Sequence, residues 1–445
     1  MKSSHSNMLK RVSYIAAGLV MLIGASVNAQ VTTQSPYSRY GVGNIKSMAL
    51  PQFKAMGGIS TAVFSPTGYS NINMMNPASY AGITLATVDI GATGSFNNLK
   101  RNGESETSFN ASLSHIALAF PVTPKSAISF GLLPYSELGY RFVNSATLTS
   151  PGSTASQDVN YIYGGEGGLN KAYFGYGFQL GKHLRLGANV EYMFGNLLQT
   201  RSTELVDQTN AINSRIETKN TVGGLTYSYG AQYNIPLDSK TSMTFGYSGS
   251  SSSSVNSTKS FVVTQYLKDP ATGNELSAMD TLVNTQNAKT KLQLPLLHSF
   301  GFSIQKYNKW LIGADYRTGK WSDLSIGGEN QQLQDTYGFS VGGQITPDIN
   351  SIGSYFNRVD YRLGFTYDKT YVKLNDQDIK QMAVTFGFGF PLASSQTRSA
   401  FYKMNFTTEL GRRGALTNGM LQENYINLHL GFTLNDRWFR RFKFD

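Results

Sequence analysis

Serine and histidine residues that could carry out nucleophilic chemistry occur side by side at two places in this 445-residue chain. The motif Ser-Leu-Ser-His at 112–115 and the pair His298-Ser299 each place a hydroxyl beside an imidazole. Neighbouring residues on a strand point to opposite faces, so we expect neither pair to form the hydrogen bond that a serine nucleophile needs. The sequence therefore predicts that the protein is not an enzyme, and it indicates no metal site and no cofactor.

A glycine-rich stretch, Gly164–Gly168 (GGEGG), has the composition of a phosphate-binding loop. No strand–loop–helix pattern surrounds it, which such a loop requires. We interpret it as a flexible outer loop.

Charged residues lie inside several segments that otherwise alternate between apolar and polar residues. A water-filled or polar lumen tolerates such charges in the middle of a strand. We therefore predict a lumenal charge network, which could equally tune an aqueous pore. Its members are Glu191, Asp315, Arg317, Arg358, Asp360 and Arg362.

The N-terminus has the pattern of an export signal. Lys2, Lys10 and Arg11 precede an apolar run at 14–24, and the small-residue motif Val-Asn-Ala ends at Ala29. We predict a signal peptide at 1–29 that is cleaved on export. The chain contains no cysteine, so disulfides, thiolate metal sites and a cysteine-linked lipid anchor are all excluded.

The composition resembles that of an outer-membrane barrel more than that of a soluble enzyme. The chain has 26 Tyr, 26 Phe and 45 Gly, and only 15% of its residues are charged. Many aromatics, much glycine and few charges suit a membrane β-barrel with aromatic girdles. The net charge of +11 is spread along the chain rather than gathered in a patch, so we do not expect nucleic acid as a partner.

Hydrophobic periodicity predicts the fold class. In the stretch 423–435, Ile426, Leu428, Leu430 and Phe432 alternate with polar residues and glycine. The same period of two recurs at 184–195, 358–368 and 382–390. This is the pattern of strands with one apolar and one wet face, and their length of about ten residues is enough to cross a bilayer.

We therefore predict an all-β fold, a transmembrane antiparallel β-barrel of about fourteen strands. Short turns alternate with long loops, the longest being 144–169 and the Ser-rich 251–288, which we expect to face outward. The expected strands are 83–96, 107–121, 126–143, 170–181, 184–200, 217–235, 241–250, 289–305, 309–319, 335–346, 357–371, 379–392, 399–412 and 423–435.

Two prolines fall inside predicted strands. Pro134 and Pro295 each remove a ladder donor, so each predicts a bulge or a kink in the wall. A tolerated distortion near the rim is one interpretation. A deliberate break in the wall is the other, and such a break has to be lined or gated in a bilayer.

The stretch before the first strand carries the most specific motif. Residues 54–80 read KAMGGISTAVFSPTGYSNINMMNPASY, with a small-residue segment at Met56, Gly57, Gly58 and Ala62 and an Asn-Pro-Ala turn at 76–78. This pattern resembles the N-terminal hatch of the FadL/OmpP1/TodX family of outer-membrane transporters of hydrophobic compounds. The segments SPYSRYGVGNI (35–45) and RWFRRFKFD (437–445) resemble a Bacteroidota branch of that family.

The resemblance implies four parts: a signal peptide (1–29), an N-terminal hatch or plug (30–81), the barrel (82–435) and a periplasmic basic-aromatic tail (436–445). It also implies residue roles. Asn76, Pro77 and Ala78 would form a moving hatch turn, Met74 and Met75 an adaptable apolar lining, and Pro134 a wall kink. The alternative interpretation of residues 76–78 is a turn that only fills the mouth of the barrel.

The function implied by the resemblance is passive uptake of hydrophobic small molecules, such as fatty-acid-like or aromatic compounds, across the bacterial outer membrane. The expected partners are outer-membrane lipid and a hydrophobic ligand. Two alternatives stay open. The chain could be a non-transporting subunit of an outer-membrane secretion or assembly complex, with outer-membrane or periplasmic proteins as partners, or it could be a general diffusion porin.

Overall fold

The computed structural model describes residues 35–64, 69–101, 103–149, 156–206, 208, 210–269, 271–392, 400–416 and 419–437. The predicted signal peptide and most of the predicted tail lie outside these residues. Among the described residues, no helix is long and apolar enough to cross a membrane.

Strands dominate the described chain, with a few short helical turns. The helical turns are η1 (Pro36–Arg39), α2 (Pro51–Lys54), η2 (Pro77–Gly82), η3 (Trp321–Asp323) and η4 (Phe356–Arg358). The strands are β1 (Asn44–Ile45), β2 (Ala86–Arg101), β3 (Glu104–Thr123), β4 (Ser126–Thr149), β5 (Ser156–Leu180), β6 (Leu184–Leu205), β7 (Asn213–Pro236), β8 (Thr241–Ser250), β9 (Ser254–Lys268), β10 (Glu275–Gln293), β11 (Leu297–Lys306), β12 (Trp310–Gly319), β13 (Ser325–Ile326), β14 (Glu329–Asn330), β15 (Thr336–Ile345), β16 (Asp360–Leu374), β17 (Gln377–Leu392), β18 (Phe401–Gly414) and β19 (Gln422–Asp436).

The sheet closes into a ring of fourteen antiparallel wall strands, which confirms the predicted fold class. β8 and β9 follow one another along β7, and β10 and β11 follow one another beside them, so each pair builds one wall strand. The ring closes where β19 pairs with β2, from Gln422 opposite Lys100 to Asp436 opposite Ala86.

The two faces of the wall follow the predicted period. On β19, Ile426 and Phe432 are exposed on the outer face, whereas Tyr425 and Thr433 are buried on the inner face. The apolar positions of the alternation therefore face outward and the polar ones inward, as in a membrane barrel.

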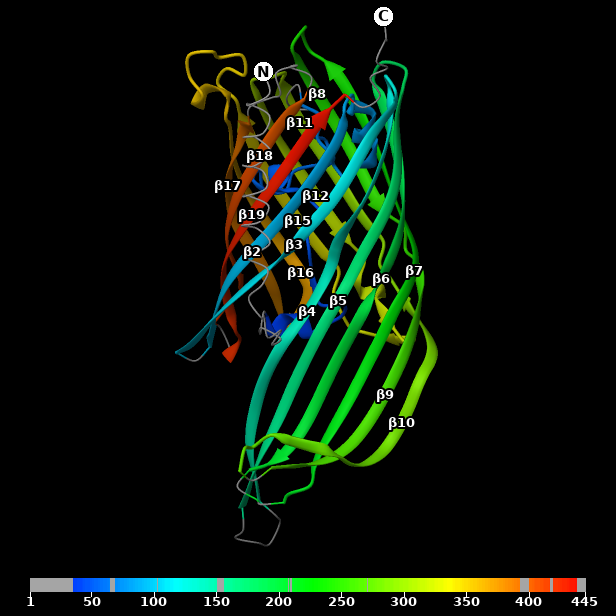
Figure 1. Ribbon diagram of the computed structural model, residues 1–445, viewed down its shortest axis with the longest axis vertical. Helices are drawn as coiled ribbons and strands as arrows, with labels where there is room; N and C mark the ends of the chain where they lie inside the picture. The colour runs from blue at the N-terminus through cyan, green and yellow to red at the C-terminus, as the bar shows by residue number, and fades with distance from the viewer. Residues whose placement is uncertain are drawn as a thin grey trace, which may run out of the picture. The chain divides into compact units, whose positions relative to one another are not determined.

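The two stretches expected to be long outer loops are mostly strand, which corrects that prediction. β4 continues to Thr149 and β5 starts at Ser156, while β9 and β10 occupy most of 251–288. These strands extend β4 to β7 into a sheet that projects well past the ends of the other hairpins, toward the bottom of Figure 1. We call the projecting parts of these six strands, β4, β5, β6, β7, β9 and β10, the extension.

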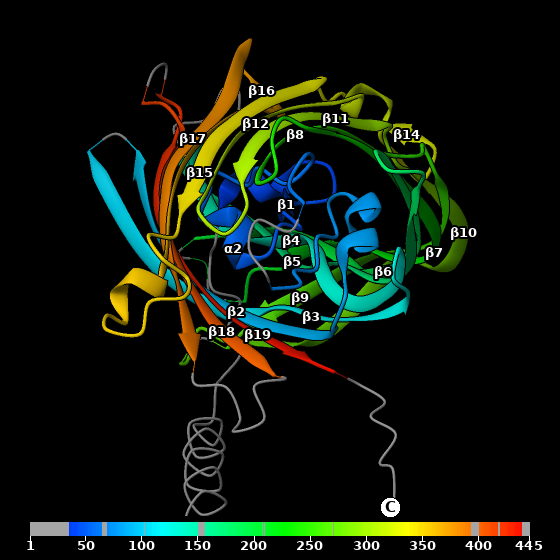
Figure 2. The ribbon, with the colours of Figure 1, turned by 90° about the horizontal axis from the view of Figure 1, so that it is seen from above.

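An N-terminal stretch fills the ring. Residues 35–64 and 69–83, called here the inner segment, lie inside the wall, as α2 and β1 show in Figure 2. Buried apolar residues form two clusters within the ring. One gathers Phe53, Met56, Ile59 and Tyr80 of the inner segment, and the other joins Tyr37 and Val42 to wall residues.

Candidate functional site

Asn76 ties the inner segment to the wall through its side-chain amide. Its Nδ2 group donates to the carbonyl of Thr61 at 2.6 Å and lies 3.3 Å and 3.2 Å from the wall carbonyls of Ala231 and Tyr247. Its Oδ1 atom accepts the backbone N–H of Ala78 at 3.1 Å, which caps η2. The Asn-Pro-Ala turn thus joins another part of the inner segment and two wall strands.

Wall glycines allow the inner segment to approach the strands backbone to backbone. A Cβ atom at Gly187 would overlap the Pro77 carbonyl group, and one at Gly364 would overlap the backbone of Met56 and Gly57. The strand glycines whose added Cβ would come within 3 Å of backbone or side-chain atoms of the inner segment are Gly175, Gly177, Gly187, Gly230, Gly246, Gly301, Gly342, Gly364 and Gly387. These glycines come from β5 around to β17, so the inner segment is held from many sides.

The Met-Gly-Gly turn is held by hydrogen bonds as well. Gly57 and Gly58 have φ values of +72° and +83°, which favour glycine. The Gly57 N–H donates to Thr385 Oγ1 at 2.8 Å. Farther along, Ser303 Oγ donates to the carbonyl of Ala62 at 2.8 Å.

The wall is incomplete between β3 and β4. Their ladder runs only from Thr123 opposite Ser126 to Ile116 opposite Leu132, although both strands continue beyond it. Pro134 lies where the register of β4 against β5 shifts. Past that point the free edge of β4 is paired by β1 of the inner segment, with Asn44 opposite Glu137.

Polar side chains bridge this wall opening. Glu137 on β4 forms an ion pair with Lys46 of the inner segment and accepts a hydrogen bond of 3.0 Å from Asn110 on β3. A small cavity of about 10 Å³, room for about one water molecule, lies beside it and is lined by Met74, His115 and Pro134, among others. The neighbouring Met75 packs against the apolar cluster but is less buried.

The Ser-His motif at 112–115 behaves differently from our expectation. Ser114 Oγ lies 2.7 Å from His115 Nδ1, and His115 Nε2 lies 2.7 Å from Asp89 Oδ1. A register shift between Gly91 and Ala92 leaves Ser114 as an extra residue, so it does not point away from His115 as regular pleating would require. The prediction that these neighbours cannot bond was therefore wrong.

This chain of hydrogen bonds also fastens the inner segment. Asp89 Oδ2 accepts from Thr433 Oγ1 at 2.7 Å and lies 3.3 Å from Gln52 Nε2 of α2. The fully buried Asp89 carboxylate thus joins three wall strands and α2. Regular alternation gives no signal of this arrangement, because the bulge creates it.

The residues predicted to form a lumenal charge network belong to separate clusters. Glu191 pairs with Lys171 at 2.6 Å, while Asp315 accepts the N–H groups of Ser60 and Thr61 at 2.8 Å and 2.9 Å. Arg317 pairs instead with Asp368 at 2.9 Å.

Asp360 and Arg362 do lie together, at 2.7 Å, and Lys403 joins them at 2.6 Å from Asp360. Arg358 is in η4, outside the wall strands, with its guanidinium 5.3 Å from the ring centre of Tyr355. The partners Lys171 and Lys403 were missed because their distance along the sequence hides the pairing. Only their inward parity on alternating strands could have indicated it.

Pro295 lies in the break between β10 and β11. The break changes which face of the wall the even-numbered residues occupy. Leu292 before it is buried inside the ring, whereas Phe300 after it is exposed on the outer face.

Comparisons with known proteins agree with this geometry. Three transporters or transporter homologues are among the solved structures that share the fold. The Ralstonia pickettii toluene transporter TbuX has 13% identity and a TM-score of 0.55 over 87% of this chain and 98% of its own. A Pseudomonas aeruginosa FadL homologue has 11% identity and a TM-score of 0.53 over 90% and 100%. The Pseudomonas putida toluene transporter TodX has 14% identity and a TM-score of 0.51 over 90% and 100%.

The chain thus has the fold of the FadL-type β-barrels. No protein with a curated description matches it. The model of the family described as BamG matches residues 8–445, and the chain belongs to that family.

Proposed function

We propose that this chain is a non-transporting barrel subunit of an outer-membrane secretion or assembly complex, the first of the alternatives to uptake. Its partners are other outer-membrane or periplasmic proteins. The family description, BamG, is in keeping with a role in assembly.

The observation that carries this proposal is the extension with its two free edges. β10 pairs with β9 on one side. On the other side, within the described part of the chain, only Leu292 and Gln293 pair in a ladder, with β13, and Lys291 accepts the backbone N–H of Gly327. β4 pairs with β5 as far as Thr149, but among the described residues its stretch 141–149 has no second neighbour. Unpaired strand edges of this length are ready templates for a strand from another chain.

The side chains along the β10 edge favour docking over solvation. Leu276, Met279 and Leu282 are about half exposed, at 49%, 56% and 56%. Natural edges that must stay unpaired are blunted by charges or proline, and this edge carries exposed apolar residues at regular intervals beside its charges, Glu275 and Asp280.

The tight hold on the inner segment supports the same proposal. Moving it would break the Asn76, Asp89 and Asp315 hydrogen bonds and separate backbones that glycines hold in contact. Such an arrangement suits a fixed plug better than a moving gate.

The test is affinity purification of the tagged full chain from its native membrane in mild detergent, with quantitative mass spectrometry of proteins and lipids. We expect a fixed set of protein partners with the wild type. The triple variant Leu276→Lys, Met279→Lys, Leu282→Lys should retain less than about a tenth of them, because lysines blunt a strand edge.

The matched control is Ile352→Lys, Phe356→Lys, Leu416→Lys, which adds the same charge at exposed apolar residues outside the extension. It should keep the partners. Recovery of the wild type without stoichiometric proteins would overturn the proposal, as would equal loss in both variants.

Passive uptake of a hydrophobic molecule is the second candidate, and the wall opening between β3 and β4 favours it. A ligand reaching the cavity beside Pro134 could leave sideways only if β1 and the Lys46–Glu137 pair moved aside. The measurement is entry of a hydrophobic solute into liposomes that contain the protein.

A disulfide lock separates the two candidates, and the cysteine-free chain provides a clean background. A Cβ at Gly387 lies 2.8 Å from Ala55 Cβ and 2.5 Å from the Phe406 carbonyl oxygen, so Ala55→Cys with Gly387→Cys can bond once the strand shifts by about 1 Å. Oxidation should leave partner recovery unchanged if the chain is a subunit. A fall in solute entry that dithiothreitol restores would support uptake instead.

A further inference from the structure

The outer face of the wall from β16 to β3 changes from apolar to polar between two adjacent rows of side chains. In one row, residues directly opposite each other across six strands are Phe365, Val384, Leu410, Ile426, Phe96 and Phe109. Two residues farther along each strand the row is Tyr367, Met382, Arg412, Asn424, Asn98 and Thr107. The change marks the edge of the hydrocarbon layer on this wall.

The next row toward the strand ends is cationic. It contains Lys380, Gln422 and Lys100, together with Lys369, which is paired with Asp378 at 3.4 Å. Among the described residues, none has a hydrogen bond or ion pair with the side chains of Lys100, Lys380 or Arg412, and all three are exposed. Three unpaired cations therefore lie within two rows that are about 7 Å apart along the strands, with Lys380 one strand from Arg412 and Lys100 two strands away on its other side.

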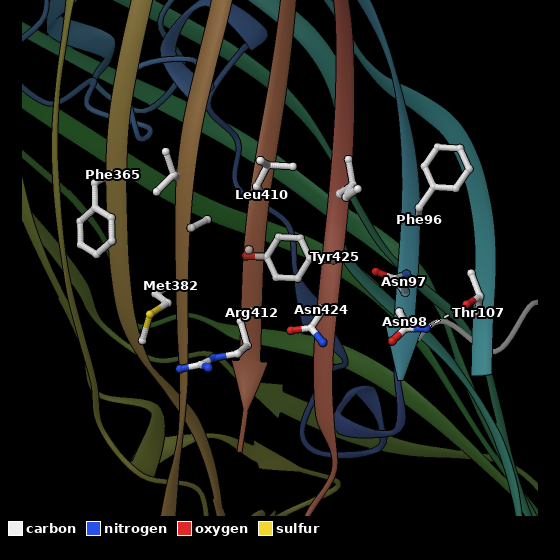
Figure 3. Close-up of a pocket in the computed structure, with 14 residues that line it drawn as sticks. Phe96, Asn97, Asn98, Thr107, Phe365, Met382, Leu410, Arg412, Asn424 and Tyr425 are labelled. Atoms are coloured by element: carbon white, nitrogen blue, oxygen red, sulfur yellow. Dashed lines mark hydrogen bonds between the residues drawn. The ribbon is translucent and has the colours of Figure 1, made fainter. Parts of the chain in front are cut away.

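A groove of about 710 Å³ crosses this boundary. It is lined by outward-facing Phe96, Val384, Leu410 and Ile426 at one level and by Arg412, Asn98 and Asn424 at the next. Figure 3 shows these two levels, with Phe365, Leu410 and Phe96 above Met382, Arg412 and Asn424. In Figure 2 the β2–β3 hairpin bends away from the ring beside this part of the wall.

We infer that this groove binds one anionic lipid of the outer leaflet, with acyl chains against the apolar row and a phosphate among Arg412, Lys380 and Lys100. Basic residues beside an apolar membrane surface recognise anionic head groups in this way. The polar row lies toward the end of the ring that carries the extension, opposite the end where β19 finishes, which places it at the outer surface. The inference does not depend on the proposed function.

A lipid fits this groove better than a protein does. The apolar part lies on the membrane-facing wall, where acyl chains already provide an apolar surface. The unpaired cations lie at the head-group level, where a single phosphate can contact more than one of them. The amide side chains of Asn98 and Asn424 add hydrogen-bond donors for phosphate or sugar oxygens.

The test is native mass spectrometry of the full chain in detergent, titrated with a bisphosphorylated hexa-acyl diglucosamine lipid. The unphosphorylated form of the same lipid is titrated in parallel. We expect one phosphorylated lipid per barrel and about tenfold weaker binding of the unphosphorylated form. The triple variant Lys100→Gln, Lys380→Gln, Arg412→Gln should bind both forms equally weakly.

The control variant is Lys125→Gln, Lys182→Gln, Lys309→Gln, which removes three exposed cations at the short turns on the other end of the ring. It should bind as the wild type does. Equal affinity of the wild type for the two lipid forms would overturn the inference, as would unchanged binding in the groove variant.

A photo-crosslinking residue in place of Leu410 tests the occupant in the native membrane. It should capture a lipid. Capture of a protein instead would show that the groove is a protein interface and would also overturn the inference.

Discussion

At the scale of single residues, the inner segment is held by wall glycines that allow backbone atoms to come close and by a side-chain amide whose donor faces carbonyl oxygens. Asn76 directs a donor at three carbonyl oxygens. Gly187 leaves space for the Pro77 carbonyl. Each contact can be tested by a substitution that changes only one or two atoms.

Replacing Asn76 with Asp keeps the shape of the side chain and removes the donor. The carboxylate would face carbonyl oxygens with no cation among the partners of Asn76, at a cost of about 3–5 kcal/mol. We expect the urea midpoint of the protein in detergent to fall and the inner segment to become sensitive to protease. Asn71→Asp, in the same segment but bonded among the described residues only to the Tyr69 carbonyl, should change little.

Adding one methyl group at Gly187 should separate the wall from η2. The overlap is with backbone atoms of Pro77, which cannot rotate away, so Gly187→Ala should cost about 1–3 kcal/mol. The comparison is Gly353→Ala, where the added Cβ has no neighbour within 4 Å. Equal thermal unfolding of the two variants would contradict the account of the wall glycines.

At the scale of elements, the loop between β12 and β15 is held by a carboxylate outside the wall strands. Asp335 accepts hydrogen bonds from Ser322 Oγ at 2.6 Å and from Lys320 Nζ at 3.0 Å. The bonds to Ser322, followed by the one to Lys320, lower the pKa of Asp335 below its ordinary value. Next to Ser322, Trp321 stacks on Tyr371 with ring centres 4.8 Å apart.

The lowered pKa gives the loop a pH dependence with a definite sign. Its stabilisation by Asp335 is complete above the ordinary pKa of an aspartate and is lost as pH falls through the lowered pKa of the folded state. We expect acid to release Trp321 from its stack, seen as a red shift in tryptophan emission. In Asp335→Asn this acid transition should disappear, and its persistence there would assign it to another group.

Sequence periodicity predicted the wall elements because each has one face in lipid. The stretch 251–288 was missed for the opposite reason. In the extension residues 275–287 of β10 are all exposed and residues 258–265 of β9 are all half-buried, so neither stretch has one buried and one exposed face, and a sequence such as SSSVNSTKS shows no apolar alternation. Of the site, the Met-Gly-Gly and Asn-Pro-Ala turns were visible, but the glycines opposite them belong to other strands, and the Ser114 bulge leaves no pattern.

At the scale of the whole molecule, the ring and the extension are separable. Beyond the extension the ring is closed by β8 and β11, whose ladder is continuous from Ser250 opposite Leu297 to Thr241 opposite Lys306. The extension therefore adds surface without contributing to closure.

Trimming one hairpin tests this separation. Thr258 lies opposite Lys289, so residues 258–289 can be replaced by an Asn-Gly turn that rejoins β9 to β10. We expect the shortened chain to form a barrel that migrates as folded without heating, with a Tm within a few degrees of the wild type, but to recover no partners.

A control replaces only the turn 269–274 by Asn-Gly and keeps both edges. It should recover the partners in full. Failure of the trimmed chain to fold would show that the extension supports the ring.

The wall glycines that contact the inner segment also constrain the order in which the chain can fold. The inner segment is synthesised before every strand that holds it, and Thr407 reaches back across 356 positions to donate to the Pro51 carbonyl. Contacts so distant along the chain form late. The seam between β19 and β2 is also complete only when the last strand has arrived. Docking of the inner segment and closure of the ring therefore belong to the same late step of biogenesis. If the β19–β2 seam formed before docking, the inner segment would be left outside the ring.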